Sequence, residues 1–233
     1  MELELKERDF QRVSKFSIFE GIPQVELKNL LQNGKVTQHT HRNTLYEMGD
    51  KALSFAIVLD GAYKLVKPTI KGDDFIMYFA TPGDAIAALL MGQEREATFP
   101  ITVKSIGSSS VYIIPKTTFH HYWKSNASIL LRLNSLLYSR MGFMQDEKAL
   151  SRAPLAQRIA WFLLKMLERS GEEKEQVIPL PLTRQEIADH LGVTVESVIR
   201  IMSQWSQSGI IRSADRHIEI SRIDQLIELL KEN

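Results

Sequence analysis

The chain has 233 residues, of which 44% are hydrophobic and 24% charged, with a formal net charge of +1 and no cysteine. These values are typical of a soluble globular protein, and they exclude disulfides and cysteine-ligated zinc or iron–sulfur sites. No apolar run approaches the roughly 18 residues of a membrane helix, and the charged N-terminus lacks the apolar core of a signal peptide. We therefore expect a cytoplasmic protein with no membrane partner.

Residues 1–116 are predicted to form a β-roll. Turn signals separate short runs rich in β-branched and aromatic residues, namely Ala56–Leu59, Tyr63–Val66, Phe75–Phe79 and Val111–Ile114. Regularly spaced glycines favour strands that turn at even intervals in a sandwich or jelly roll; they are Gly49, Gly61, Gly72 and Gly83. The fold class expected for the whole chain is α+β.

Residues 117–150 have the pattern of one long helix. Its apolar face is wider than packing against a single domain requires, which favours a dimerisation helix. The side chains predicted at the dimer seam are Leu130, Leu133, Leu137, Met141 and Met144. Burial of this face within one subunit is the alternative.

Residues 151–233 are predicted to form a winged helix domain. Pro154 is acceptable only in a first helical turn, so a new helix is expected to begin there. Its apolar stripe consists of Leu155, Ile159, Phe162, Leu163 and Met166. An extended piece, Val177–Leu182, precedes two further helices. The chain then continues as a hairpin, Ile210–Ile220, with its turn at Ala214–Arg216, and as a short amphipathic helix, Ile223–Lys231.

The stretch Leu182–Arg200, LTRQEIADHLGVTVESVIR, has the pattern of a helix-turn-helix. Thr183 and Glu186 have the spacing of a capping box, which predicts a helix from Arg184. Gly192 follows where a tight turn needs positive φ, and Thr194 can cap a second helix near Val195. An ordinary pair of core helices is the alternative.

The second helix places polar side chains where a recognition helix meets base edges, near its N-terminus. These side chains are Glu196, Ser197 and Arg200. Arg200 can donate two hydrogen bonds to guanine, and Glu196 can accept one from cytosine. Residues 183–222 hold equal numbers of basic and acidic residues, so DNA binding would depend on local arginines rather than on a basic domain. A surface ion pair between Glu196 and Arg200 is the alternative.

The order of β-roll, long helix and winged helix-turn-helix resembles the cAMP receptor / fumarate-nitrate-reduction regulator (CRP/FNR) family of bacterial transcription factors. The segments that carry the resemblance are FSIFEGIPQVELKNLL, LYEMGDKALSFAIVLDGAYKLV, TPGDAIAALL and, most specifically, LTRQEIADHLGVTVESVIRIM. The resemblance implies a homodimer, a palindromic double-stranded DNA operator and RNA polymerase as a further partner.

Within the helix-turn-helix, the resemblance assigns roles to single positions. Thr183 and Arg184 match the positions that hold the DNA backbone. The base-reading positions match Val195, Glu196, Ile199 and Arg200. The oxygen-sensing branch of the family also has valine at the position of Val195, but it has serine where this chain has Ile199.

The resemblance implies the fold of the effector site but not its ligand. Where a cAMP site has a carboxylate, an arginine and a serine, this chain has Ala88, Phe99 and Pro100. We therefore expect an unknown small effector and no high-affinity cAMP binding. A cAMP site that uses Arg95 and Glu96 instead is the alternative. The full set of candidate pocket residues is Gly83, Ala88, Leu89, Arg95, Glu96, Phe99, Pro100, Arg140, Met144 and Gln145.

Other chemistries find little support in the sequence. The oxygen-sensing branch uses a cysteine-ligated cluster, for which this chain has no ligands. A heme role is not expected for the four histidines near the roll, which are His39, His41, His120 and His121. No metal site and no catalytic constellation is predicted, so the chain is not expected to be an enzyme. A nucleotide-binding module that acts on a protein partner is the alternative class.

Overall fold

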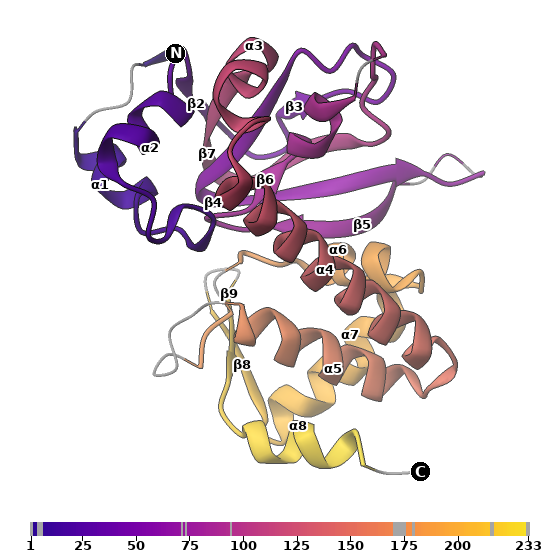
Figure 1. Cartoon of the computed structure of the whole chain (residues 1–233). Coiled ribbons are helices and arrows are strands. Elements are labelled where there is room, and N and C mark those ends of the chain that lie inside the picture. Colours follow the sequence, from indigo (N-terminus) through magenta and orange to yellow (C-terminus); the bar gives the residue numbers. More distant parts are fainter. Residues whose placement is uncertain are drawn as a thin grey trace. The chain divides into compact units, whose positions relative to one another are not determined.

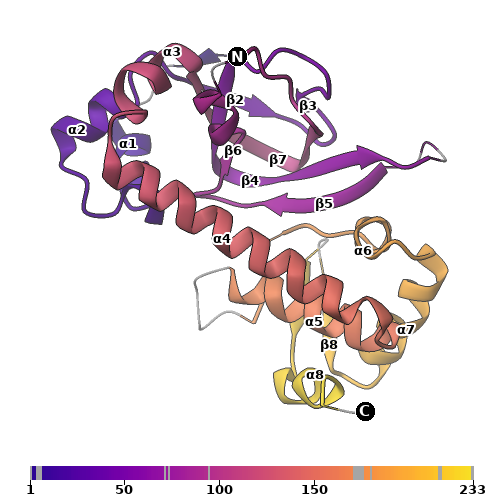
Figure 2. The same cartoon turned by 45° about the vertical axis from the view of Figure 1, so that its right-hand side comes forward.

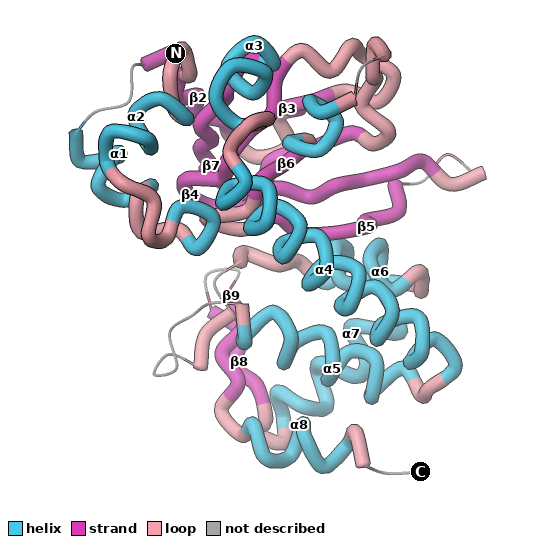
Figure 3. The backbone as a smooth tube through the Cα atoms, in the orientation of Figure 1, coloured by secondary structure: helices cyan, strands magenta, loops and turns pink. Residues whose placement is uncertain are grey.

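The computed structural model describes residues 2–3, 7–70, 72, 74–93, 95–169, 176–178, 180–214 and 217–231. The chain forms two compact units: the first holds residues 1–67 and 77–141, and the second holds residues 68–76 and 142–233. Strands predominate in the first unit and helices in the second (Figure 3). The expected α+β class with an N-terminal β-roll is confirmed.

The roll is one antiparallel sheet with the strand order β1-β2-β7-β4-β5, in which β3 pairs with β7 and β6 with β4 (Figures 1 and 2). The strands are β1 (Glu2–Leu3), β2 (Lys35–His39), β3 (Thr44–Tyr46), β4 (Ser54–Pro68), β5 (Asp74–Ala80), β6 (Ala85–Ile86) and β7 (Thr102–Pro115). The long strands β4 and β7 pair along most of their length and hold the sheet together.

Two runs predicted as separate strands, residues 56–59 and 63–66, belong to the single strand β4. Gly61 lies between them in an irregular stretch of the β4–β7 pairing, not in a turn. Its φ is +66°, and an added Cβ would lie 2.4 Å from the Ser109 Oγ atom, so only glycine fits there. The bulge bends one strand where the sequence predicts a turn.

The helices of the first unit contribute side chains to the core that they share with the sheet. They are α1 (Glu7–Val13), α2 (Gln24–Leu30), α3 (Lys116–Thr118), a π-helix (Phe119–Trp123) and most of α4 (Ala127–Ala149), with 3₁₀ turns at Ser17–Phe19 and Ala88–Gly92. Trp123 is fully buried, and its indole N–H donates to the Leu30 carbonyl at 2.7 Å. This contact fixes the start of the long helix against α2.

The prediction of one helix from residue 117 is wrong at its N-terminal end. The π-helix ends at Trp123, and α4 begins only at Ala127. The Asn126 side-chain oxygen accepts a hydrogen bond from the Ile129 N–H at 3.2 Å, as an N-cap does. Burial of Phe119 and Trp123 in the roll's core turns the chain at this point.

The second unit is a helical domain closed by a two-stranded wing. After a 3₁₀ turn (Leu150–Arg152), its elements are α5 (Leu155–Glu168), α6 (Arg184–Leu191), α7 (Val195–Gln207), β8 (Ile211–Ala214), β9 (His217–Ile220) and α8 (Ile223–Leu229). Pro154 is the N-cap of α5, where the sequence predicts that a new helix begins. Val177, in the predicted extended piece, bridges to Glu219 in the wing, a pairing that the sequence did not predict. The last two residues of the predicted wing turn, Asp215 and Arg216, lie outside the described residues.

The core of the second unit confirms the predicted helix stripe except at Leu155, which is only partly buried. Ile159, Phe162, Leu163 and Met166 on α5 are all buried.

Among the described residues, no helix combines the length and the apolar character needed to cross a membrane.

Candidate functional site

The start of α6 is fixed by the predicted capping box. Thr183 Oγ1 accepts a hydrogen bond from the Glu186 N–H at 3.1 Å, and Glu186 Oε2 accepts one from the Thr183 N–H at 3.0 Å. Glu186 is buried, so this pairing satisfies a carboxylate that burial would otherwise disfavour. The box sets where α6 begins and which of its faces meets the core.

The turn between α6 and α7 also forms as predicted. Gly192 has a φ of +65° and is the C-cap of α6. Thr194 occupies the N-cap position of α7, but its hydroxyl pairs with the Ser197 hydroxyl at 3.0 Å and not with a backbone N–H. The turn brings the N-terminus of α7 to the surface of the second unit.

Helix α7 is divided into a buried face and an exposed face. Val198, Met202 and Trp205 are buried in the core of the second unit. Glu196, Ile199 and Arg200 are exposed, and Val195 and Ser197 are partly exposed. The structure therefore brings the predicted base-reading residues together on one accessible surface, which we call the reading face. The guanidinium of Arg200, the carboxylate of Glu196 and the apolar side chain of Ile199 lie side by side on this face.

Arg184 lies at the first position of α6 and contacts the wing. Its Nη2 atom donates to Ser213 Oγ on β8 at 2.7 Å. The side chain is partly buried, and this burial lowers the pKa of Arg184 from its usual value. The sequence did not predict a role for Ser213. Its place in the predicted wing hairpin is the only signal that sets it apart from other exposed serines, and that signal is weak.

A pocket of about 310 Å³ lies inside the first unit. Its wall comes from β4, from the segment around the 3₁₀ turn Ala88–Gly92, from the chain leading into β7, and from α4. The lining residues are Leu65, Ala85, Ile86, Ala87, Ala88, Leu89, Leu90, Phe99, Pro100, Ile101, Val103, Leu133, Leu136, Leu137 and Arg140. Of these described residues, only Arg140 is charged.

Half of the predicted pocket residues line this pocket, namely Ala88, Leu89, Phe99, Pro100 and Arg140. The others do not line it: Gly83 faces Phe16, while Arg95, Glu96, Met144 and Gln145 are exposed. Glu96 forms an ion pair with Lys51 at 2.9 Å. The alternative cAMP contacts from Arg95 and Glu96 are therefore placed on the surface.

Two residues predicted at a dimer seam have other neighbours. Leu133 is buried in the core of its own roll, and both Leu133 and Leu137 line the pocket. The exposed apolar side chains of α4 are Leu130, Leu131, Tyr138, Met141 and Met144. The predicted dimer seam mixed two faces of the helix, because apolar residues occur on both.

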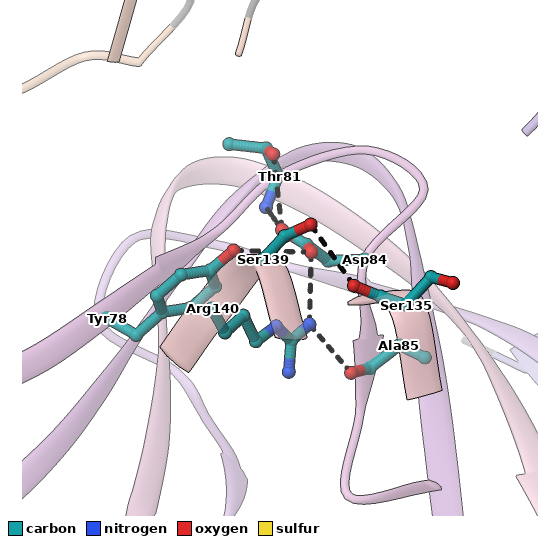
Figure 4. Close-up of polar contacts among 7 residues, drawn as sticks. All are labelled: Tyr78, Thr81, Asp84, Ala85, Ser135, Ser139 and Arg140. Carbon is teal, nitrogen blue, oxygen red and sulfur yellow. Dashed lines mark hydrogen bonds and ion pairs between the residues drawn. The ribbon is translucent and has the colours of Figure 1, made fainter. Parts of the chain in front are cut away.

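The pocket's cation is held by a network of polar contacts (Figure 4). Arg140 Nη2 donates to Asp84 Oδ1 at 3.0 Å and to the Ala85 carbonyl at 2.9 Å. Asp84 Oδ2 accepts from the Thr81 N–H at 2.8 Å, and the Tyr78 hydroxyl lies 3.4 Å from Asp84 Oδ1. Burial disfavours the charged form of Arg140, but the Asp84 carboxylate and Tyr78 outweigh it and raise the pKa of Arg140.

The histidines of the first unit are held by protein contacts. His39 packs edge-on against Tyr63, with the ring centroids 5.7 Å apart, and its burial lowers the pKa of its imidazole. His41 Nδ1 accepts from the Gly107 N–H at 3.0 Å, and His121 Nδ1 lies 2.8 Å from the Thr117 carbonyl oxygen. Among the described residues, no three His, Asp or Glu side chains are grouped as a metal site.

Comparison with family models and known regulators agrees with this arrangement. Residues 157–229 match the model of the Crp-like helix-turn-helix domain, and residues 37–126 match that of the cyclic nucleotide-binding domain. The nitrogen fixation regulation protein FixK of Bradyrhizobium diazoefficiens is 29% identical over 211 residues, which cover 89% of this chain and 86% of FixK. The fumarate and nitrate reduction regulatory protein of Escherichia coli is 25% identical, covering 88% and 81% of the two chains.

Solved structures show the same fold. The structure of FixK2 from Bradyrhizobium japonicum has a TM-score of 0.72 at 24% identity and covers 84% of this chain and 96% of that one. A CRP-family regulator from Thermus thermophilus, TTHB099, has a TM-score of 0.68 at 19% identity, with coverages of 84% and 97%. These similarities extend over both units.

Proposed function

Because this chain belongs to the CRP/FNR family of DNA-binding transcriptional regulators and is not an enzyme, we propose that it acts as a homodimer on a palindromic operator. In this proposal a small effector binds the pocket of the first unit and controls DNA affinity. As a regulator of transcription it acts in the cytoplasm, on the chromosome, with RNA polymerase as its further partner.

The observation that carries the DNA-reading part is the division of α7 into two faces. Three buried side chains fix the helix in its domain, while the reading face is left accessible at the helix N-terminus. Selection of binding sequences from a random double-stranded library tests the proposal. We expect an inverted repeat with half-sites about one helical turn apart. Recovery of unrelated sequences would favour a module that acts on a protein partner.

The dimer part rests on the exposed apolar side chains of α4. Exposed fractions are 68% for Leu131, 78% for Tyr138 and 57% for Met141. Exposed apolar side chains at helical spacing are typical of an interaction surface. A second copy of α4 fits this surface, since two-fold symmetry would then match a palindromic operator.

We expect Arg200→Ala to weaken binding to the selected operator by roughly 1–3 kcal/mol and to relax the preference at one base pair. The physical reason is the loss of a guanidinium that can donate two hydrogen bonds to a guanine edge. Titration of the operator and of single-base variants at one salt concentration measures both effects.

Two matched variants make the Arg200 result interpretable. Arg184→Ala should weaken all sequences more evenly and lower the salt dependence, since Arg184 is assigned to phosphate. Gln207→Ala, an exposed change at the other end of α7, should leave affinity unchanged. An equal loss on operator and random DNA for Arg200→Ala would contradict its assignment to bases.

We expect no micromolar binding of cAMP or cGMP. The phosphate of a cyclic nucleotide needs a cation and polar donors, and its ribose hydroxyl needs an acceptor, but the lining of the pocket offers neither at Ala88, Phe99 and Pro100. Calorimetric titration of the wild-type protein measures this directly. Micromolar binding that disappears in Arg95→Ala would show that the exposed loop closes over the ligand after all.

A further inference from the structure

We propose that the pocket of the first unit binds a neutral, predominantly apolar small molecule. The inference deepens the effector part of the proposed function and rests on it, since it names the chemical class of ligand for the same site.

The first argument is the chemistry of the wall. Fourteen of the fifteen lining residues are Leu, Ile, Val, Ala, Phe or Pro, and Arg140 is the remaining one. Transfer of a charged or strongly hydrogen-bonding group into such surroundings loses its hydration without replacing it. An apolar molecule loses little hydration and gains contact on several sides.

The second argument is that the cation in the pocket wall, Arg140, is already neutralised. Arg140 is bound to Asp84 at 3.0 Å, and Asp84 is in turn held by the Thr81 backbone N–H (Figure 4). An anionic ligand at Arg140 would approach the Asp84 carboxylate as well, and like charges at short range repel. The pair is therefore matched to a ligand without net charge.

The third argument is size. The pocket has about 310 Å³, and a dry cavity of about 150 Å³ lined by similar side chains is enough to bind benzene. A ligand with roughly ten to twelve carbon atoms is the corresponding size, by the same comparison. One fused pair of aromatic rings or a short branched hydrocarbon chain meets this limit.

The test uses naphthalene and naphthoate as probes with the full-length protein and no DNA. They share one ring system and differ by a carboxylate. Titration followed by ligand fluorescence should show one naphthalene site per chain and at least tenfold weaker binding of naphthoate. Equal or tighter binding of naphthoate, or no saturable naphthalene site, would overturn the proposal.

Variants locate the site. Ala88→Leu and Leu136→Phe each add volume at the pocket wall, and either should weaken naphthalene binding at least tenfold. Leu53→Ala, which removes an exposed apolar side chain of the same unit, should leave binding unchanged. If one wall variant unfolds, as seen in its circular dichroism, the other carries the test. Unchanged binding in a folded wall variant would place the probe elsewhere and refute the assignment.

The selection of DNA sequences is measured in a separate experiment. A failure of the naphthalene test is therefore distinct from a failure of the DNA-binding proposal.

Discussion

Leu130→Glu combined with Met141→Glu should convert the protein to monomers and weaken binding to a full palindrome by at least about 100-fold. On a two-fold axis, a residue of α4 would lie near its own copy, so each substitution brings two carboxylates together in a desolvated seam. Loss of bivalent attachment removes an avidity factor of about 10² to 10⁴. Sedimentation equilibrium measures the mass, and gel shifts on full and half-site DNA measure the affinity.

A matched control separates the seam from the helix as a whole. Ser139 lies on the same helix, is exposed, and is on the opposite side of the helix axis from Leu130. Ser139→Glu introduces one carboxylate, as each of the two seam substitutions does, and should leave both mass and operator affinity unchanged. Half-site binding should be alike in all variants, because the reading face belongs to a different unit. A double variant that keeps the dimer mass would refute the seam.

The helix-turn-helix could be predicted because its signals are local. The capping box spans four residues, the turn needs one glycine, and the buried stripe of α7 follows from helical periodicity. Each of these features is decided by side chains close in sequence, so propensity and tertiary packing agree. The strand runs of the roll are predictable for the same reason, except where Gly61 bends β4 and does not end it.

The effector pocket could be predicted only in part, because its wall is built from distant segments. Apolar residues occur on two faces of α4, but the sequence does not say which of them the roll covers. In the structure the covered side includes Leu133, and the exposed side includes Met141. Likewise, Asp84 and Arg140 are 56 residues apart, and no local spacing predicts that they pair.

The distance between segments in the chain also explains why the sequence left a cAMP site with Arg95 and Glu96 as an alternative. The structure supports this alternative less. Arg95 and Glu96 stand near the matching segment in the chain, yet both side chains are exposed, and Glu96 is paired with Lys51. Proximity in sequence to a binding segment is thus not proximity to its pocket. The residues that do reach the pocket are apolar, with the exception of an arginine whose charge is already balanced.

We expect Asp84→Ala to lower the free energy of unfolding by about 3–5 kcal/mol, because it leaves the guanidinium of Arg140 without its counterion in a largely buried position. Asp84 is buried, and the side chain of Arg140 is 19% exposed, so water offers little compensation. Urea denaturation of the full chain, followed by circular dichroism, measures the change.

Two further variants decide whether the loss comes from the uncompensated charge. The Arg12–Asp60 pair forms two hydrogen bonds, but its side chains are 45% and 63% exposed, so Asp60→Ala should cost no more than about 1 kcal/mol. Replacing both members of the buried pair, as Asp84→Leu with Arg140→Met, should recover most of the stability lost in Asp84→Ala, since no buried charge is then left alone. If Asp84→Ala costs no more than Asp60→Ala, the buried pair does not stabilise the first unit. Its role as a neutralised charge in the wall of an apolar pocket would then lose its energetic basis.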